Sequence, residues 1–216
     1  MESLIQTITV YALPVLFGIT LHEAAHGYVA RMFGDPTAWQ AGRISLNPIR
    51  HVDMVGTIIV PLVLLFSTKL MGGAGLLFGW AKPVPVDWSR LRNPKRDMLW
   101  VALAGPGSNL VMAIIWTLSL RLLAGTGAAP GDFWVQMAIA GIQVNLILMA
   151  LNMVPLPPLD GGRVVFSLLP SRMAWQYSRI EPYGLLILII LMFTGVLWIV
   201  LEPLLAFGQL IVNWFL

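Results

Sequence analysis

The amino-acid sequence predicts an all-α polytopic membrane protein, with about 4–6 transmembrane or re-entrant helices. Hydrophobic residues make up 58% of the 216 residues and charged residues only 11%, whereas a soluble domain has about 25% charged residues. The uncharged residues also form long runs, and the mean hydropathy is +0.81. Such a chain cannot cover a soluble core with polar surface, and disorder requires low hydrophobicity and high net charge.

Uncharged runs locate the expected membrane helices. They are rich in Leu, Ala, Ile and Met, and they lack the strict alternation of barrel strands. A spanning helix needs about 20 apolar residues, so the long runs are expected to span and the short ones to be shallow or re-entrant. The long runs are 3–21, 98–120, 133–159 and 182–201, and the short ones are 54–68 and 203–216.

The segments between these runs predict no further domain. Residues 1–216 are expected to form a single domain, because no soluble domain interrupts the runs. Residues 42–47 alternate like a short β-strand, although a surface loop is an equally good interpretation of so short a pattern. Residues 105–109 contain two glycines and fit close helix packing, and Asn145 is expected to bridge helices by hydrogen bonds.

Charge and cysteine content exclude several function classes. The net charge is only +3, which provides no basic face for nucleic acid. The chain has no cysteine, so a thiolate metal site and a cysteine nucleophile are both excluded. The lipid bilayer is therefore an expected partner, and nucleic acid is not.

The first long run ends in His22-Glu23-Ala-Ala-His26, the H-E-x-x-H pattern of zinc peptidases. Two histidines four residues apart lie on one helix face, about 6 Å from each other, and can bind one metal ion. Glu23 is rotated by about 100° from His22 and can hold a water molecule without being a ligand. Ionisable groups in an apolar helix are costly, which favours a functional role over a chance helix end.

A catalytic zinc ion needs a third protein ligand, and Asp160 is the best candidate. It follows a proline-rich stretch after the 133–159 run and precedes two glycines. Because proline cannot continue a helix, we expect irregular backbone that presents the carboxylate at the end of the run. Asn152 lies eight residues before Asp160 and is expected to reach the same cavity. Asp97 is interpreted as a helix start.

Two segments resemble the signature motifs of the site-2 protease family, which are intramembrane zinc metalloproteases. They are residues 20–34, TLHEAAHGYVARMFG, and residues 152–162, NMVPLPPLDGG. Four further segments are similar to one compact, mainly prokaryotic branch of that family. They are GRISLNPIRHVD (42–53), FGWAKPVPV (78–86), RNPKRDM (92–98) and LAGPGSN (103–109).

The resemblance implies roles for five residues. His22, His26 and Asp160 would bind one zinc ion per chain, Glu23 would be the general base, and Asn152 would hold the substrate or the oxyanion. A PDZ domain, which many members insert before the Asp motif, is excluded because only 50 residues separate Asn109 from Asp160.

The implied activity is hydrolysis of peptide bonds within or near transmembrane segments of membrane proteins or peptides. The implied location is a prokaryotic plasma membrane. Two alternatives remain: a membrane metal-binding or transport protein, and a non-catalytic scaffold of the same fold. The sequence lacks the inverted repeats that are typical of transporters. A non-catalytic scaffold would normally have lost one of the four key residues, and all four are present: His22, Glu23, His26 and Asp160.

A shared zinc ion also constrains the topology. The 3–21 and 133–159 runs each lead into a ligand, so both helices should run in the same direction. Segment 54–81 must then make no net crossing, which places every basic residue except Arg121 toward one side. By the positive-inside rule this side is cytoplasmic, the N-terminus is outside, and the zinc ion lies nearer the cytoplasmic face. The loops expected in the cytoplasm are 34–53, 82–96 and 161–181.

Overall fold

The computed structural model describes residues 2–50, 53, 56, 59 and 82–216. Helices dominate this part of the chain, and four of them are long and apolar enough to cross a membrane. These four are α1 (Glu2–Met32), α4 (Pro94–Gly125), α5 (Phe133–Asn152) and α9 (Val196–Asn213). The predicted all-α polytopic fold is therefore confirmed.

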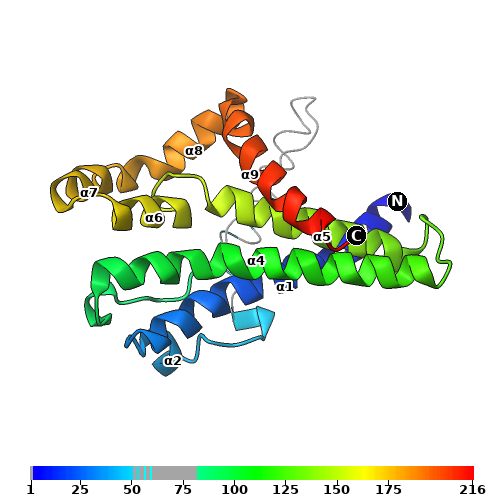
Figure 1. Ribbon diagram of the computed structural model, residues 1–216, viewed down its shortest axis with the longest axis horizontal. Coiled ribbons are helices and arrows are strands. Elements are labelled where there is room, and N and C mark those ends of the chain that lie inside the picture. Colours follow the sequence, from blue (N-terminus) through cyan, green and yellow to red (C-terminus); the bar gives the residue numbers. More distant parts are fainter. Residues whose placement is uncertain (1, 51–52, 54–55, 57–58, 60–81) are drawn as a thin grey trace.

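Helices α1, α4 and α5 pack against one another and form the centre of the molecule. In Figure 1, α1 runs from right to left, α4 returns from left to right, and α5 runs in the direction of α1. The expectation that the two helices leading into the candidate ligands run in the same direction is thus correct.

Shorter helices follow α5 and lie toward the left end of Figure 1. They are α6 (Asp160–Leu168), α7 (Ser171–Ser178), η4 (Glu181–Tyr183) and α8 (Gly184–Phe193). Two more short helices, α2 (Thr37–Gln40) and η1 (Pro48–Arg50), follow α1, and η3 (Trp88–Arg90) precedes α4.

Local sequence explains where these helices begin and end. At the start of α4, the Asn93 amide donates to Asp97 Oδ2 at 2.7 Å, and the Asp97 amide donates back to the Asn93 carbonyl at 2.8 Å. Pro94 occupies the first turn, where a missing N–H costs nothing. Asp97 thus lies in the first turn of α4, at the start of a helix as expected. Helix α5 stops at Asn152 because a proline-rich stretch follows.

Two sequence-based boundaries need correction. The run 182–201 is not one spanning helix, because Gly195 adopts a left-handed conformation (φ 76°) and separates α8 from α9. The fourth candidate span is α9, which continues through Pro203. Asp160 was expected on irregular backbone, whereas it is the first residue of α6.

Residues 42–47 contain a turn at Gly42 followed by irregular backbone, and no strand is assigned to them. The surface-loop interpretation of this segment is therefore the better one. The expected absence of a net crossing concerns residues 54–81, most of which lie outside the described residues.

The residues on either side of that segment meet at one end of the molecule. The Arg43 guanidinium donates to the Lys82 carbonyl at 2.9 Å, and the Asp87 amide donates to Asp35 Oδ2 at 2.7 Å. Arg92 in turn donates to the carbonyl of Met32, the last residue of α1. The chain before residue 50 and after residue 82 therefore lies at the same end as the C-terminus of α1.

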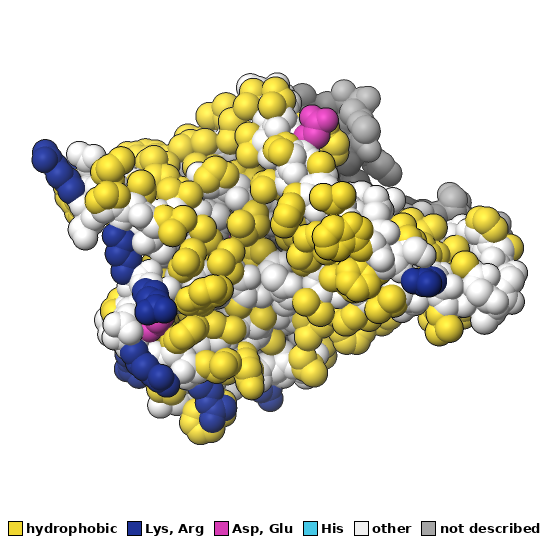
Figure 2. Space-filling view, in the orientation of Figure 1, with side chains coloured by type: hydrophobic (Ala, Val, Ile, Leu, Met, Phe, Trp, Pro, Cys, Tyr) yellow, Lys and Arg dark blue, Asp and Glu magenta, His cyan; other side chains and the backbone are white. Residues whose placement is uncertain are grey.

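Basic side chains gather at this same end. Figure 2 shows most of the visible Lys and Arg residues at the left of the molecule, and a separate one at the right. Arg31 lies in the last turn of α1, and Lys95, in the first turn of α4, donates to the Leu169 carbonyl after α6. Arg121 lies near the opposite end of α4.

This arrangement predicts which positions share a side of the membrane. Single cysteines replacing Arg50 and Arg92 in the cysteine-free chain should react with a membrane-impermeant thiol reagent from the same side. A cysteine replacing Arg121 should react from the other side. Labelling is measured in intact cells or oriented vesicles, and reaction of Arg50→Cys and Arg92→Cys from opposite sides would contradict the arrangement.

Candidate metal centre

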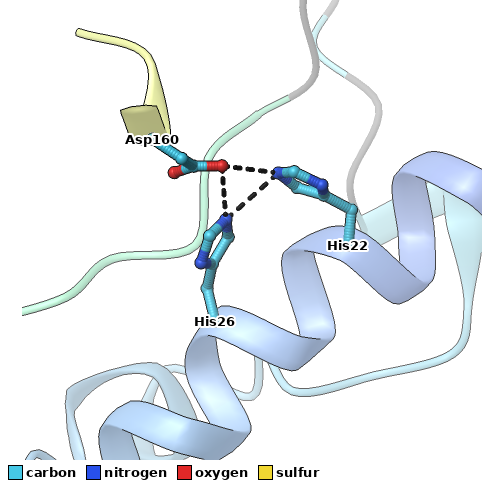
Figure 3. Close-up of side chains that lie close together, drawn as sticks. All are labelled: His22, His26 and Asp160. Carbon is cyan, nitrogen blue, oxygen red and sulfur yellow. Dashed lines mark hydrogen bonds and ion pairs between the residues drawn. The ribbon is translucent and has the colours of Figure 1, made fainter. Parts of the chain in front are cut away.

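The side chains of His22, His26 and Asp160 point toward one another (Figure 3). The two histidines lie one turn apart on α1, and their Nε2 atoms are 3.1 Å apart. Asp160 Oδ2, from the start of α6, lies 3.2 Å from His22 Nε2 and 3.3 Å from His26 Nε2. Three residues that the sequence analysis selected as ligands are thus brought together, and we call them the triad.

The triad has the dimensions of a tetrahedral zinc site. Ligand atoms at about 2.0–2.1 Å from zinc lie about 3.3–3.4 Å from one another when the angles are tetrahedral. The separations of 3.1–3.3 Å in the triad are close to this value. Three protein ligands leave the fourth position open, as in catalytic rather than structural zinc sites.

Hydrogen bonds on the far side of each imidazole identify the tautomers. His22 Nδ1 lies 2.7 Å from Asn109 Oδ1, and His26 Nδ1 lies 2.7 Å from the Val101 carbonyl oxygen. Both partners are acceptors, so each Nδ1 carries a proton, and each Nε2 of the neutral imidazole presents a lone pair to the triad.

With both imidazoles neutral, the two Nε2 atoms and Asp160 Oδ2 are three electron-pair donors that converge on one point. Asp160 Oδ2 is buried and accepts no hydrogen bond from the part of the chain that the structure describes. Two imidazole nitrogens and a buried carboxylate oxygen at 3.1–3.3 Å from one another suit a cation bound between them. Their nitrogen and oxygen chemistry matches the preferences of zinc, so the residues fit the metal that the sequence implied.

Helix α4 closes one side of the centre at Gly105. A Cβ atom at this position would lie 2.6 Å from His22 Nε2, closer than any van der Waals contact allows. The small residues 105–109 therefore do more than pack helices, because Gly105 leaves room for the ligand atoms themselves.

Glu23 lies beside the triad on α1 and is held by a backbone amide. Its Oε2 accepts a hydrogen bond from the Val84 N–H at 2.7 Å. Val84 is buried between two prolines, which have no N–H of their own. The hydrogen bond from Arg43 to the Lys82 carbonyl attaches this segment to the loop that follows α2.

Asn152 lies at the last residue of α5, and its amide donates to the Leu148 carbonyl one turn earlier at 3.0 Å. Within the described residues it forms no hydrogen bond with the triad. Its role in catalysis stays a prediction.

Three contributors to the centre were not predicted from the sequence: Asn109, Gly105 and the Val84 amide. Asn109 had a signal, an isolated amide in an apolar run, but the glycines around it favoured simple helix packing. The expectation for Asn145 is confirmed, since its Oδ1 accepts from Asn109 Nδ2 at 3.0 Å.

A polytopic helical fold with an H-E-x-x-H helix and an additional aspartate defines a membrane zinc metalloprotease. Comparison with known proteins gives the same class, since residues 127–195 match Peptidase family M50. A Bacillus subtilis protein named "Putative zinc metalloprotease YwhC" is 38% identical over 199 residues, which cover 90% of this chain and 85% of that protein. This chain therefore belongs to peptidase family M50.

Two more distant relatives carry similar names. "Putative zinc metalloprotease Rip2" of Mycolicibacterium smegmatis is 28% identical over 182 residues, covering 84% of this chain and 66% of that protein. "Putative zinc metalloprotease MJ0611" of Methanocaldococcus jannaschii is 29% identical over 148 residues, covering 68% of this chain and 64% of that protein. No solved structure gives a significant match. The predicted family and enzyme class are confirmed, and zinc is the metal that the family implies.

Two alanine substitutions in α4 test the close approach at Gly105. Gly105→Ala should weaken zinc binding by at least about 100-fold, because the added methyl group displaces both imidazoles. This effect exceeds the loss of affinity expected when a ligand loses a hydrogen bond to a neighbouring group. Gly107→Ala is the matched control, since its Cβ would meet nothing within 4 Å. Zinc affinity is measured by competition with a chelator, and equal affinities for the two variants would contradict the geometry.

Proposed function

We propose that this zinc metalloprotease is an intramembrane endopeptidase, which hydrolyses peptide bonds within or near transmembrane segments of other proteins. The observation that carries the proposal is the position of the triad. Two of its three members belong to α1, a helix apolar enough to cross a membrane, and His22 and Asp160 are at most 9% exposed. A peptidase site built there is suited to substrates that reach it from the bilayer.

Zinc bound by His22, His26 and Asp160 would supply Lewis-acid chemistry. Glu23 takes a proton from the attacking water molecule, whose oxygen forms a bond with the carbonyl carbon of the scissile peptide. The C–N bond then breaks, and Glu23 passes the proton to the leaving amine nitrogen. The Val84 N–H occupies Oε2 of Glu23, which leaves Oε1 to exchange the proton.

The location of the triad suggests how substrates reach it. The triad uses the C-terminal half of α1, and basic side chains gather at that end. By the positive-inside rule the triad lies nearer the cytoplasmic face of a prokaryotic plasma membrane. Water reaches such a depth more easily than the bilayer centre, and a substrate helix must unwind there because its carbonyls are hydrogen-bonded. We expect substrates with helix-weakening residues near that face.

Replacement of the general base tests the proposal. Glu23→Gln should bind zinc like the wild type but lose about 10²–10⁴-fold in cleavage rate, because it removes the base and no ligand. His22→Ala, His26→Ala and Asp160→Ala should lose zinc as well as activity. Zinc content and cleavage of a model transmembrane substrate are measured on the purified protein.

Glu202→Gln is the matched control, since Glu202 is an exposed acid in α9. It should keep both zinc and cleavage. Near-normal cleavage by Glu23→Gln would contradict the proposed base, and zinc binding without any cleavage by the wild type would favour a metal-binding or scaffold protein.

The contact between Glu23 and Val84 gives a second test. Val84→Pro removes the N–H that holds the carboxylate, in a segment where proline is already present on both sides. It should lower kcat by about 10–100-fold, the cost of a misplaced catalytic group, while zinc binding stays unchanged. Val84→Ala keeps the N–H and should retain most of kcat. A similar kcat for the two variants would show that the amide does not position the base.

A further inference from the structure

Asn109 is a fully buried amide in α4, and each of its polar atoms has a partner. Its Oδ1 contacts His22 Nδ1 at 2.7 Å, and its Nδ2 donates to the Gly18 carbonyl at 3.1 Å and to Asn145 Oδ1 at 3.0 Å. One side chain thus connects α1, α4 and α5 at the level of the candidate metal centre.

Asn145 fixes the direction of these hydrogen bonds. Asn145 Nδ2 donates to the Gly141 carbonyl at 2.8 Å, so Asn145 Oδ1 must be the acceptor that faces Asn109. Asn109 then has to present Nδ2 to Asn145 and Oδ1 to His22. An acceptor at that position requires a proton on His22 Nδ1, which leaves the Nε2 lone pair for the triad.

The two histidines are held in different ways. His26 Nδ1 donates to a backbone carbonyl, that of Val101, which is present whatever side chain occupies the position. Among the described residues, Asn109 is the only side chain that contacts the Nδ1 atom of a triad histidine. The tautomer and ring orientation of His22 therefore depend on a single amide.

We propose that Asn109 is a positioning residue of the metal centre, which holds His22 in the Nδ1–H tautomer and is itself oriented by Asn145. The proposal rests on the ligand role of His22 in the proposed function. Groups that orient a metal-binding histidine in this way typically contribute about 10–100-fold to metal affinity.

Zinc affinity gives the first readout. Asn109→Leu has nearly the same shape but no acceptor, and it should weaken zinc binding by about 10–100-fold in chelator competition. Asn145→Leu leaves Asn109 free to turn and should have a smaller effect in the same direction. Thr117→Val is the matched control, because Thr117 is a buried polar residue of α4 whose hydroxyl donates to the Ala113 carbonyl of the same helix. It should bind zinc like the wild type.

The tautomer of His22 gives a second readout that does not depend on zinc or on activity. The chain has only three histidines, so ¹⁵N-histidine NMR of the zinc-free, full-length protein in detergent can resolve each ring. His22 should be the Nδ1–H tautomer in the wild type and a mixture of tautomers in Asn109→Leu. Asn109→Asp keeps an acceptor and should restore the Nδ1–H form.

The outcomes separate this proposal from the proposed function. An unchanged tautomer and unchanged zinc affinity in both Asn109→Leu and Asn145→Leu would overturn the positioning role, even if the wild type is an active protease. A changed tautomer in a protein that cleaves no substrate would support the positioning role and contradict the proposed function. Should Asn109→Leu fail to fold, Asn145→Leu provides the comparison: a changed tautomer or weaker zinc binding supports the positioning role, and no change in either overturns it.

Discussion

The structure depends on the convergence of three electron-pair donors in apolar surroundings. His22 Nε2, His26 Nε2 and Asp160 Oδ2 lie 3.1–3.3 Å apart, with both imidazole protons on the far side of the rings. Little water is available to solvate His22 and Asp160, since each is at most 9% exposed. A cation bound between the atoms stabilises this arrangement, and its binding explains why a helix otherwise suited to lipid carries polar residues.

The rest of the bundle keeps these atoms in place. Helices α1 and α5 run in the same direction, so the chain after α5 delivers Asp160 to the end of α1 that carries the histidines (Figure 1). Helix α4 packs against both helices, runs in the opposite direction and contributes two features. Gly105 leaves room for the imidazoles, and Asn109 joins all three helices by hydrogen bonds. Packing and ligand orientation are thus achieved by the same residues.

The sequence predicts those parts of the centre that have a local pattern. Two histidines four residues apart identify one helix face, and a proline-rich stretch before Asp160 identifies the end of α5. The requirement that they share an ion then predicts the parallel helices. Contacts without a local pattern cannot be predicted in this way. The His22–Asn109 pair spans 87 positions, the Val84 amide is a backbone group that any residue but proline provides, and the break at Gly195 depends on a single backbone conformation.

The central claim, that the triad binds zinc, is tested most directly by X-ray absorption at the zinc edge on the purified protein. We expect a four-coordinate ion with nitrogen and oxygen ligands at about 2.0–2.1 Å and two imidazoles in the wild type. In His26→Ala, if residual zinc is retained, only one imidazole should remain. A sulfur ligand at about 2.3 Å, or a wild-type spectrum unchanged by His26→Ala, would contradict the assignment of the triad as the metal centre.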